Sequence, residues 1–167
     1  MQIIKCTKKL QKEMGLKKAD LSEAEPTVEV IGPWHANLIY ILGKKCVLFV
    51  NDKTLFNFIV AGVTRAQIKE LTDLFIQNLT CALLNERIDE ASVNKIIDEH
   101  SSIEYKNTDN KSVLGSINDL AFHYKLSIED EGSIHTHQIP NIIKRLNHMP
   151  MGALKYAYAI DALKESI

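Results

Sequence analysis

The fold of this chain is decided by one stretch, WHANLIYILGKKCVLFVNDKTLFNFIVAG, which occupies residues 34–62. Apolar runs lie at residues 38–42 and 46–50, and a third occupies residues 55–61 with one asparagine inside it. Apolar runs of this length, bounded by turn residues, are typical of buried strands. The connections between them are short, which favours antiparallel neighbours. The stretch therefore predicts an antiparallel meander, centred on residues 34–61, as the middle of the fold.

Helical periodicity follows the meander, so we expect an α+β fold with helices packed on the sheet. Thr64 and Gln67 fit a capping box, in which the side chain of each residue bonds the backbone N–H of the other. The helix that starts there is expected to run to Asn85. Its apolar stripe consists of Ile68, Leu71, Phe75, Leu79, Ala82 and Leu83. Because residues 46–50 are all apolar, that strand needs cover on both faces.

The rest of the sequence predicts shorter strands and further helices around this centre. Strands are expected at residues 3–7, 28–31 and 103–106, the last at an edge of the sheet. Helices are expected at residues 8–14, 90–99, 112–130, from Pro140 to before Pro150, and 153–166, although residues 154–160 could also extend as a strand. No linker or low-complexity tract divides the sequence. We therefore expect residues 1–167 to form a single α+β domain.

The overall charge argues against a dedicated nucleic-acid binder. The 20 basic and 21 acidic residues nearly cancel, whereas such proteins usually have a basic excess. Lysines at positions 8, 9, 12, 17 and 18 make the N-terminal region basic. They lack interleaved aromatic residues, so a solvated face is the simpler interpretation, and nucleic-acid binding through them is an alternative.

The remaining composition predicts a cytoplasmic protein. We expect no secretory signal, because residues 1–14 contain no long apolar core, and no apolar run approaches the ~20 residues that span a bilayer. Cys6, Cys46 and Cys81 are odd in number and contain no CxxC pair, which is typical of reduced thiols.

Polar residues at the borders of the meander form the main candidate site. His35 and Asn37 are two residues apart on a strand, so they point to one face. At the same end of the predicted sheet lies a polar turn made of Asn51, Asp52, Lys53 and Thr54. A histidine, a carboxylate and an ammonium together could perform acid–base or phosphate chemistry. Alternatively, the asparagine and aspartate stabilise the turn, the lysine is solvated, and the histidine bonds a backbone carbonyl.

Two weaker signals lie in the second half of the sequence. Asn118 lies on an apolar line between Leu114 and Phe122, so we expect it to be buried and hydrogen-bonded, with a ligand-facing role as the alternative. His135 and His137 alternate like metal ligands, but two ligands do not complete a zinc site. We therefore expect no metal and no cofactor.

Four motifs resemble a family of small bacterial proteins known only as a domain of unknown function. They are IIKCTKKL (3–10), WHANLIYILGKKCVLFVNDKTLFNF (34–58), SVLGSINDLAFHYK (112–125) and PMGALKYAY (150–158). The resemblance covers nearly the whole chain and implies a bacterial, single-domain, stand-alone protein. It supplies no reaction and no catalytic residue.

Three functional hypotheses follow from these observations. The sequence has no Gly-rich phosphate loop, GxSxG elbow or HExxH motif. The leading hypothesis is therefore a non-catalytic binding or interaction module, which serves a protein partner, a second copy of itself, or an accessory role in defence or plasmid maintenance. The second is a small enzyme acting on a phosphorylated or nucleotide ligand, with His35 and Asp52 as acid–base groups and Lys53 as phosphate contact. The third is nucleic-acid binding through the N-terminal lysines.

Overall fold

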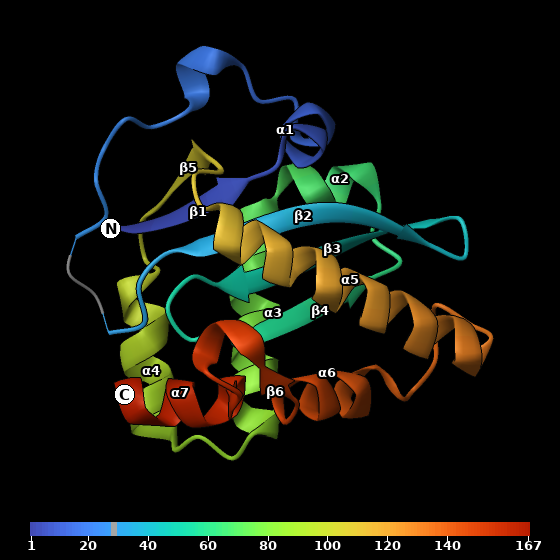
Figure 1. Ribbon diagram of the computed structural model, residues 1–167. Helices are drawn as coiled ribbons and strands as arrows, with labels where there is room; N and C mark the ends of the chain where they lie inside the picture. The colour runs from blue at the N-terminus through green and yellow to red at the C-terminus, as the bar shows by residue number, and fades with distance from the viewer. Residues whose placement is uncertain (28–29) are drawn as a thin grey trace.

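A five-stranded mixed sheet forms the centre of the protein (Figure 1). The computed structural model describes residues 1–27 and 30–167. The strand order is β4-β3-β2-β1-β5. The bounds are β1 Gln2–Cys6, β2 Trp34–Ile41, β3 Lys44–Asn51, β4 Asn57–Ala61 and β5 Ile103–Asn107.

The sheet is only partly the predicted antiparallel meander. β2, β3 and β4 are antiparallel neighbours, as expected. β1, however, is parallel to both β2 and β5. The prediction of an antiparallel sheet is wrong for this half, because long crossovers connect its strands and allow parallel pairing. The chain passes through a helix between β1 and β2, and through three helices between β4 and β5.

Within residues 1–27 and 30–167, seven α-helices surround the sheet, and their boundaries refine the predicted ones. The bounds are α1 Lys8–Met14, α2 Arg65–Lys69, α3 Leu71–Asn85, α4 Glu90–Glu99, α5 Lys111–Glu131, α6 Ile139–Asn147 and α7 Ala159–Ser166. The capping box of Thr64 and Gln67 is confirmed. The single helix expected up to Asn85 is instead two, because Glu70 leaves the helical region with φ −96° and ψ 47°.

The other differences from expectation lie in loops and at the C-terminus. The strand expected at residues 28–31 falls partly outside the described residues, and residues 30–31 are not in a strand. Leu55 has a φ of 57°, so it belongs to the turn before β4. Before α7 come a 3₁₀ turn, Gly152–Leu154, and a two-stranded hairpin of β6 Pro150–Met151 and β7 Ala157–Tyr158. Within the part of the chain that the structure describes, no helix has the length and apolar character to cross a membrane.

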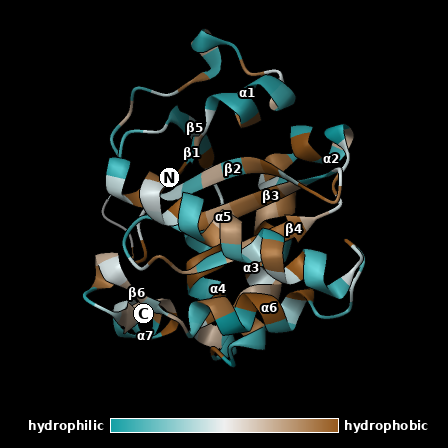
Figure 2. Ribbon diagram, turned by 45° about the vertical axis from the view of Figure 1, so that its right-hand side comes forward, coloured by the Kyte–Doolittle hydropathy of each residue, from teal (hydrophilic) through white to brown (hydrophobic). Residues whose placement is uncertain are grey.

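Side-chain alternation along the strands produces two hydrophobic cores, one on each face. On one face Trp34, Phe49 and Phe58 pack in the same cluster as Phe75 of α3, and the Trp34 and Phe75 ring centroids are 5.2 Å apart. On the other face, residues of β3 and β4 pack with α5 and α6. Residues 46–50 are fully buried, so the expected cover on both faces is confirmed. In Figure 2 the central strands are largely hydrophobic, while the helices alternate hydrophobic and hydrophilic positions.

Both edges of the sheet are covered by other parts of the chain. At the β5 edge the Ser22 amide donates to the Tyr105 carbonyl at 2.8 Å, and Lys106 Nζ donates to the Ala24 carbonyl at 3.1 Å. At the β4 edge α6 packs against the strand. The Ser22 contact uses a backbone carbonyl of β5 that an uncovered edge strand would offer to another chain.

Asn57 is the centre of a buried polar network at the β4 edge. Its N–H donates to Asn147 Oδ1 at 3.0 Å, and Asn147 Nδ2 donates to the Asn57 carbonyl at 2.7 Å. Tyr124 of α5 donates its hydroxyl to Asn57 Oδ1 at 2.6 Å. One carboxamide from the end of α6 thus satisfies both outward backbone groups of Asn57. This explains why an asparagine interrupts the third apolar run.

Removal of the Asn147 carboxamide should destabilise the protein strongly. In Asn147→Ala the buried N–H and C=O of Asn57 lose their partners, so we expect the free energy of unfolding to fall by about 3 kcal/mol. Denaturant unfolding measures the difference. Asn141→Ala, at an exposed position of the same helix, should change stability by no more than about 0.5 kcal/mol. Equal effects of the two substitutions would contradict the role of the network.

Candidate functional site

Four charged or titratable side chains meet beneath the start of α5, and we call them the charged corner: Lys5, His35, Asp52 and Asp109. Lys5 and His35 are aligned in the parallel β1–β2 pair, so both point to the face that α5 covers. Asp52 lies in the turn after β3, and Asp109 directly precedes Asn110, the N-cap residue of α5. Four separate segments therefore build this corner.

The corner is held together by short polar contacts. Lys5 Nζ lies 2.8 Å from Asp52 Oδ2 and 2.8 Å from Asp109 Oδ1. His35 Nδ1 lies 2.6 Å from Asp52 Oδ1. The other ring nitrogen, His35 Nε2, is buried and has no hydrogen-bond partner among the described residues. The corner is thus an ammonium between two carboxylates, one of which also orients an imidazole.

Burial makes the corner a nearly closed unit. His35 is 0% exposed, and the side chains of Lys5 and Asp52 are 10% and 11% exposed. Only Asp109 reaches solvent substantially. Burial alone would lower the pKa of Lys5, but the hydrogen bonds from its ammonium to Asp109 and Asp52 outweigh burial and raise that pKa.

The other residues of the expected polar site have separate partners. Asn37 Oδ1 accepts from the Thr7 hydroxyl at 2.9 Å. Asn51 braces its turn, since its Oδ1 accepts from the Thr54 N–H and hydroxyl, both at 2.9 Å. Lys53 is exposed, and its Nζ donates to the Val30 carbonyl at 3.3 Å. The structure thus brings His35 together with Asp52 and leaves the rest of the set outside the corner.

The expectation that Asn118 is buried is wrong. The buried positions of α5 include Val113, Ile117, Leu120 and Tyr124, which recur at intervals of three and four residues. Asn118 is exposed on a different side of the helix. Phe122, one turn later, is also 64% exposed. The side of α5 that carries Asn118 and Phe122 therefore faces away from the sheet.

Two residues of the corner, Lys5 and Asp109, are absent from the set that sequence reasoning selected. Lys5 is a single charge inside the apolar strand IIKC, and Asp109 immediately precedes a helix cap. An isolated charge within a buried strand needs a partner, which is the signal that could have identified Lys5. Its partners depend on parallel pairing, which the sequence pattern did not indicate.

Part of the corner has donor atoms suited to a divalent metal ion. His35, Asp52 and Asp109 each offer one ligand atom, and these atoms lie within 4.8 Å of one another. Imidazole and carboxylate are ligands that zinc accepts. The Lys5 ammonium, however, lies at hydrogen-bond distance from both carboxylates. The chain itself thus supplies the cation at this place.

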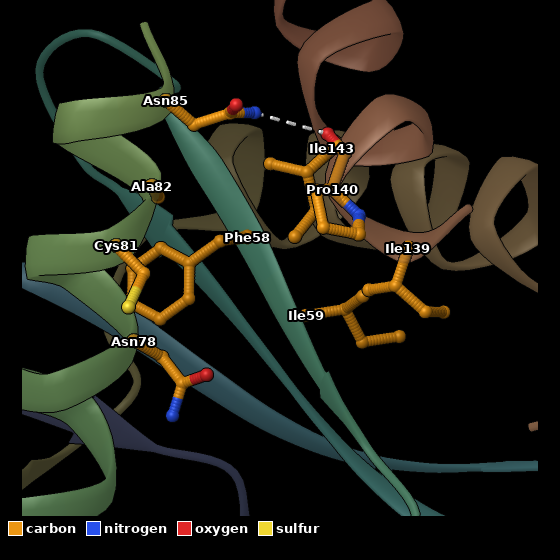
Figure 3. Close-up of a pocket in the computed structure, with 9 residues that line it drawn as sticks. All are labelled: Phe58, Ile59, Asn78, Cys81, Ala82, Asn85, Ile139, Pro140 and Ile143. Carbon is orange, nitrogen blue, oxygen red and sulfur yellow. Dashed lines mark hydrogen bonds between the residues drawn. The ribbon is translucent and has the colours of Figure 1, made fainter. Parts of the chain in front are cut away.

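A second candidate site is an open pocket of about 300 Å³ between α3, β4 and α6. We call it the edge pocket, because β4 is an edge strand (Figure 3). Its lining consists of Phe58, Ile59, Asn78, Cys81, Ala82, Asn85, Ile139, Pro140 and Ile143. Among the described residues that line it, none is charged. Asn85 Nδ2 donates to the Pro140 carbonyl at 3.4 Å, which links the two helices across the pocket.

Cys81 is the accessible thiol of the edge pocket. Cys6 and Cys46 are buried, and burial raises the pKa of both. Because the thiolate is the reactive form, these two thiols react slowly with alkylating reagents. Cys81 is exposed on α3. It therefore provides a selective chemical handle on the wall of the pocket.

Another hollow, of about 380 Å³, lies beside the turn between β2 and β3. Its lining includes Tyr40, Lys44, Lys45 and His135. Lys45 is already paired with Glu13 of α1, and this hollow shares no residue with the charged corner. His135 and His137 are both exposed in turns.

The chain belongs to the family described as "Domain of unknown function (DUF6933)", whose model matches residues 3–162. The match contains both the charged corner and the edge pocket. No curated protein and no solved structure matches the chain.

Loss of the Lys5 ammonium should weaken the fold. In Lys5→Met, Asp52 and Asp109 face each other without a cation between them, so we expect stability at pH 7 to fall by about 2 kcal/mol, less than for a fully buried pair because Asp109 is half exposed. Folding raises the pKa of Lys5, so its contribution is complete at neutral pH and is lost as pH rises through the raised value. The deficit of the variant should therefore shrink above about pH 10.5. Chemical denaturation across pH measures it, and Lys53→Met, at an exposed lysine, should show neither effect.

Removal of the whole Lys5 side chain should open the corner to a metal ion. In Lys5→Ala the cation position between the carboxylates is vacated, and we expect Zn²⁺ to raise the melting temperature of this variant. Wild-type protein should not respond, because its own ammonium competes for the same oxygens. Differential scanning calorimetry with and without Zn²⁺ makes the comparison. A response in the wild type that His35→Ala abolishes would show that the ion displaces Lys5.

Proposed function

We propose that this protein is a non-catalytic binding module and that the edge pocket is its binding site. The observation that carries the proposal is a contrast between two places in the fold. The edge pocket is open, uncharged and lined mostly by apolar side chains. The charged corner has its polar groups bonded mainly to one another and its histidine fully buried.

The size and construction of the edge pocket support a small ligand. A volume of about 300 Å³ is at the lower end of the range for small-molecule sites. The walls come from α3, β4 and α6, which are regular elements rather than mobile loops. A few polar groups, from Asn78 and Asn85, stand among apolar neighbours. Such sites obtain affinity from apolar burial and orientation from a few hydrogen bonds.

The charged corner gives weaker support to the alternative of an enzyme acting on a phosphorylated ligand. Lys53, the expected phosphate contact, bonds a backbone carbonyl outside the corner. A phosphate brought to His35 would meet the carboxylates of Asp52 and Asp109, and like charges at this distance repel. Nucleic-acid binding is supported by the exposure of the N-terminal lysines at positions 8, 9, 12, 17 and 18, of which Lys9 lies over the Tyr40 ring.

A thermal-shift comparison tests the proposal. The wild type, Cys81→Trp and Leu84→Trp are screened against nucleosides, nucleotides, sugars and neutral amides. The new indole at position 81 fills the pocket, whereas position 84 is exposed on the same helix and does not line it. A ligand at 100 times its Kd stabilises by about 2.7 kcal/mol, which for a chain of this length raises the melting temperature by about 5–10 °C.

We expect ligands that stabilise the wild type and Leu84→Trp to have no effect on Cys81→Trp. Alkylation of Cys81 with N-ethylmaleimide should block the same ligands, and bound ligand should slow the alkylation. A phosphorylated compound whose effect is lost in His35→Ala but kept in Cys81→Trp would contradict the proposal and favour the enzyme hypothesis. Circular dichroism confirms that each variant is folded.

A further inference from the structure

The hollow of about 380 Å³ beside the turn between β2 and β3 has a lining of one charge sign. We call it the β2–β3 hollow, and its turn projects at the right of Figure 1. Its charged or titratable side chains are Lys44, Lys45, His135 and Tyr40. Among the described residues that line it, none is an aspartate or a glutamate. Because the whole chain has 20 basic and 21 acidic residues, this excess of positive charge is a local property.

Lys44 presents an ammonium that the fold does not use. The residue is exposed, and its side chain has no hydrogen bond or ion pair with another described residue. It follows the two-residue turn of Leu42 and Gly43, whose φ angles of 50° and 73° are both positive. Such turns join antiparallel strands in a fixed register, and here Lys44 pairs with Ile41. The start of the lysine side chain is therefore fixed at the hollow, and its three N–H donors are left for solvent or a ligand.

His135 reaches the same hollow from the segment after α5. Its ring lies over Gly62, since a Cβ on that glycine would stand 3.5 Å from His135 Cε1. The residue is exposed, and its ring makes no hydrogen bond with the described part of the chain. Even a neutral imidazole has one N–H donor. Two side chains from distant segments thus offer unused donors at one place.

Lys45 is the lining cation that already has a carboxylate partner. Its Nζ lies 2.5 Å from Glu13 Oε1 of α1, and its side chain is 30% exposed. The hydrogen bond from Lys45 lowers the pKa of Glu13, and the charges of Arg65 and Lys69 on α2 lower it further. One carboxylate therefore serves three cations, and the surroundings of the hollow keep an excess of positive charge.

Tyr40 adds an aromatic surface beside these cations. It pairs with Lys45 across β2 and β3, so the two side chains lie on the same face of the sheet. Its residue is 45% exposed, and the Lys9 ammonium lies 5.2 Å from the ring centroid. The wall of the hollow thus combines a ring with lysine side chains, which suits an organic ligand that carries an anionic group.

We infer that the β2–β3 hollow binds a small molecule through a phosphate group. Lys44 and His135 donate to the phosphate oxygens, and Lys45 adds the N–H groups that Glu13 leaves free. Hydrogen bonds between charged partners are the strong ones, and a phosphate monoester is close to dianionic at neutral pH. The volume lies within the range of small-molecule sites. The organic part of the ligand packs beside Tyr40.

The same cations are less suited to a nucleic-acid strand. Binding of a strand requires a basic groove that follows its backbone over several nucleotides. The segment that brings His135 to the hollow is preceded by the acidic residues 129–131, so the basic surface does not continue along it. The inference concerns a different place from the edge pocket and does not rest on the proposed function.

Titration of the ¹⁵N-labelled full chain with phenyl phosphate tests the site. We expect saturable shifts of the amide signals of Gly43 and Gly62, which both line the hollow, and none at Gly152, which does not. Lys44→Gln removes the unpaired ammonium and should weaken binding about tenfold, the loss expected for a hydrogen bond to a charged group. Lys95→Gln, at an exposed position of α4, changes the net charge equally and should leave the affinity unchanged.

Glu13→Gln should act in the opposite direction. It removes the negative charge beside Lys45 and keeps the shape of the side chain, so we expect phenyl phosphate to bind roughly fivefold more tightly. A parallel titration with inorganic phosphate distinguishes two sources of the same group. Equal affinity identifies free phosphate as sufficient, and tighter binding of phenyl phosphate identifies a phosphorylated organic ligand; both results support a phosphate site.

Absence of saturable shifts at Gly43 and Gly62 overturns the inference. An equal loss of affinity in Lys44→Gln and Lys95→Gln does so too, because it would indicate attraction by net charge alone. The same holds if a single-stranded oligonucleotide shifts these signals and phenyl phosphate does not. Cys81→Trp should bind phenyl phosphate as the wild type does, so the result is independent of the edge pocket. Circular dichroism confirms that each variant is folded.

Discussion

The arrangement of the whole molecule depends on the burial of β3 on both of its faces. A strand whose residues 46–50 are all fully buried cannot lie at the surface of a sheet, so helices must cover it from two sides. α3 occupies one side, and α5 and α6 occupy the other. The neighbouring strand β4 is consequently held between α3 and α6 at its free edge. The edge pocket is the space that these two helices leave where they meet the strand.

The charged corner results from a different constraint, the insertion of β1 between β2 and β5. Parallel pairing places Lys5 beside His35, on a face that is otherwise apolar. A charge in that position is tolerated only if it is paired, and Asp52 and Asp109 provide the pairing from two separate loops. The corner therefore joins β1, β2, the turn after β3 and the start of α5. Its contacts connect these four segments to one another, although its histidine and carboxylates are residue types that also occur in active sites.

The sequence predicted those parts of the structure that local patterns determine. The three meander strands, the Thr64 cap, the edge strand at residues 103–106 and the stripe that includes Phe75 were all visible as periodicity or capping signals. The parallel position of β1 was not, because pairing between distant segments leaves no mark on local spacing. The same reason hid Lys5 and Asp109 from the candidate site. Asn118 was misplaced because α5 is apolar on more than one side, and the pattern could not show which side faces the sheet. The edge pocket depends on where α3 and α6 meet β4, which local spacing in the sequence does not report.

The cover over both sheet edges has a consequence for the behaviour of the protein at high concentration. Strand edges with free N–H and C=O groups are the usual starting points of intermolecular sheet growth and fibril formation. Here α6 lies along β4, and residues 22–24 lie along β5. With both edge strands in contact with other parts of the chain, few backbone groups are left from which intermolecular sheet growth could start.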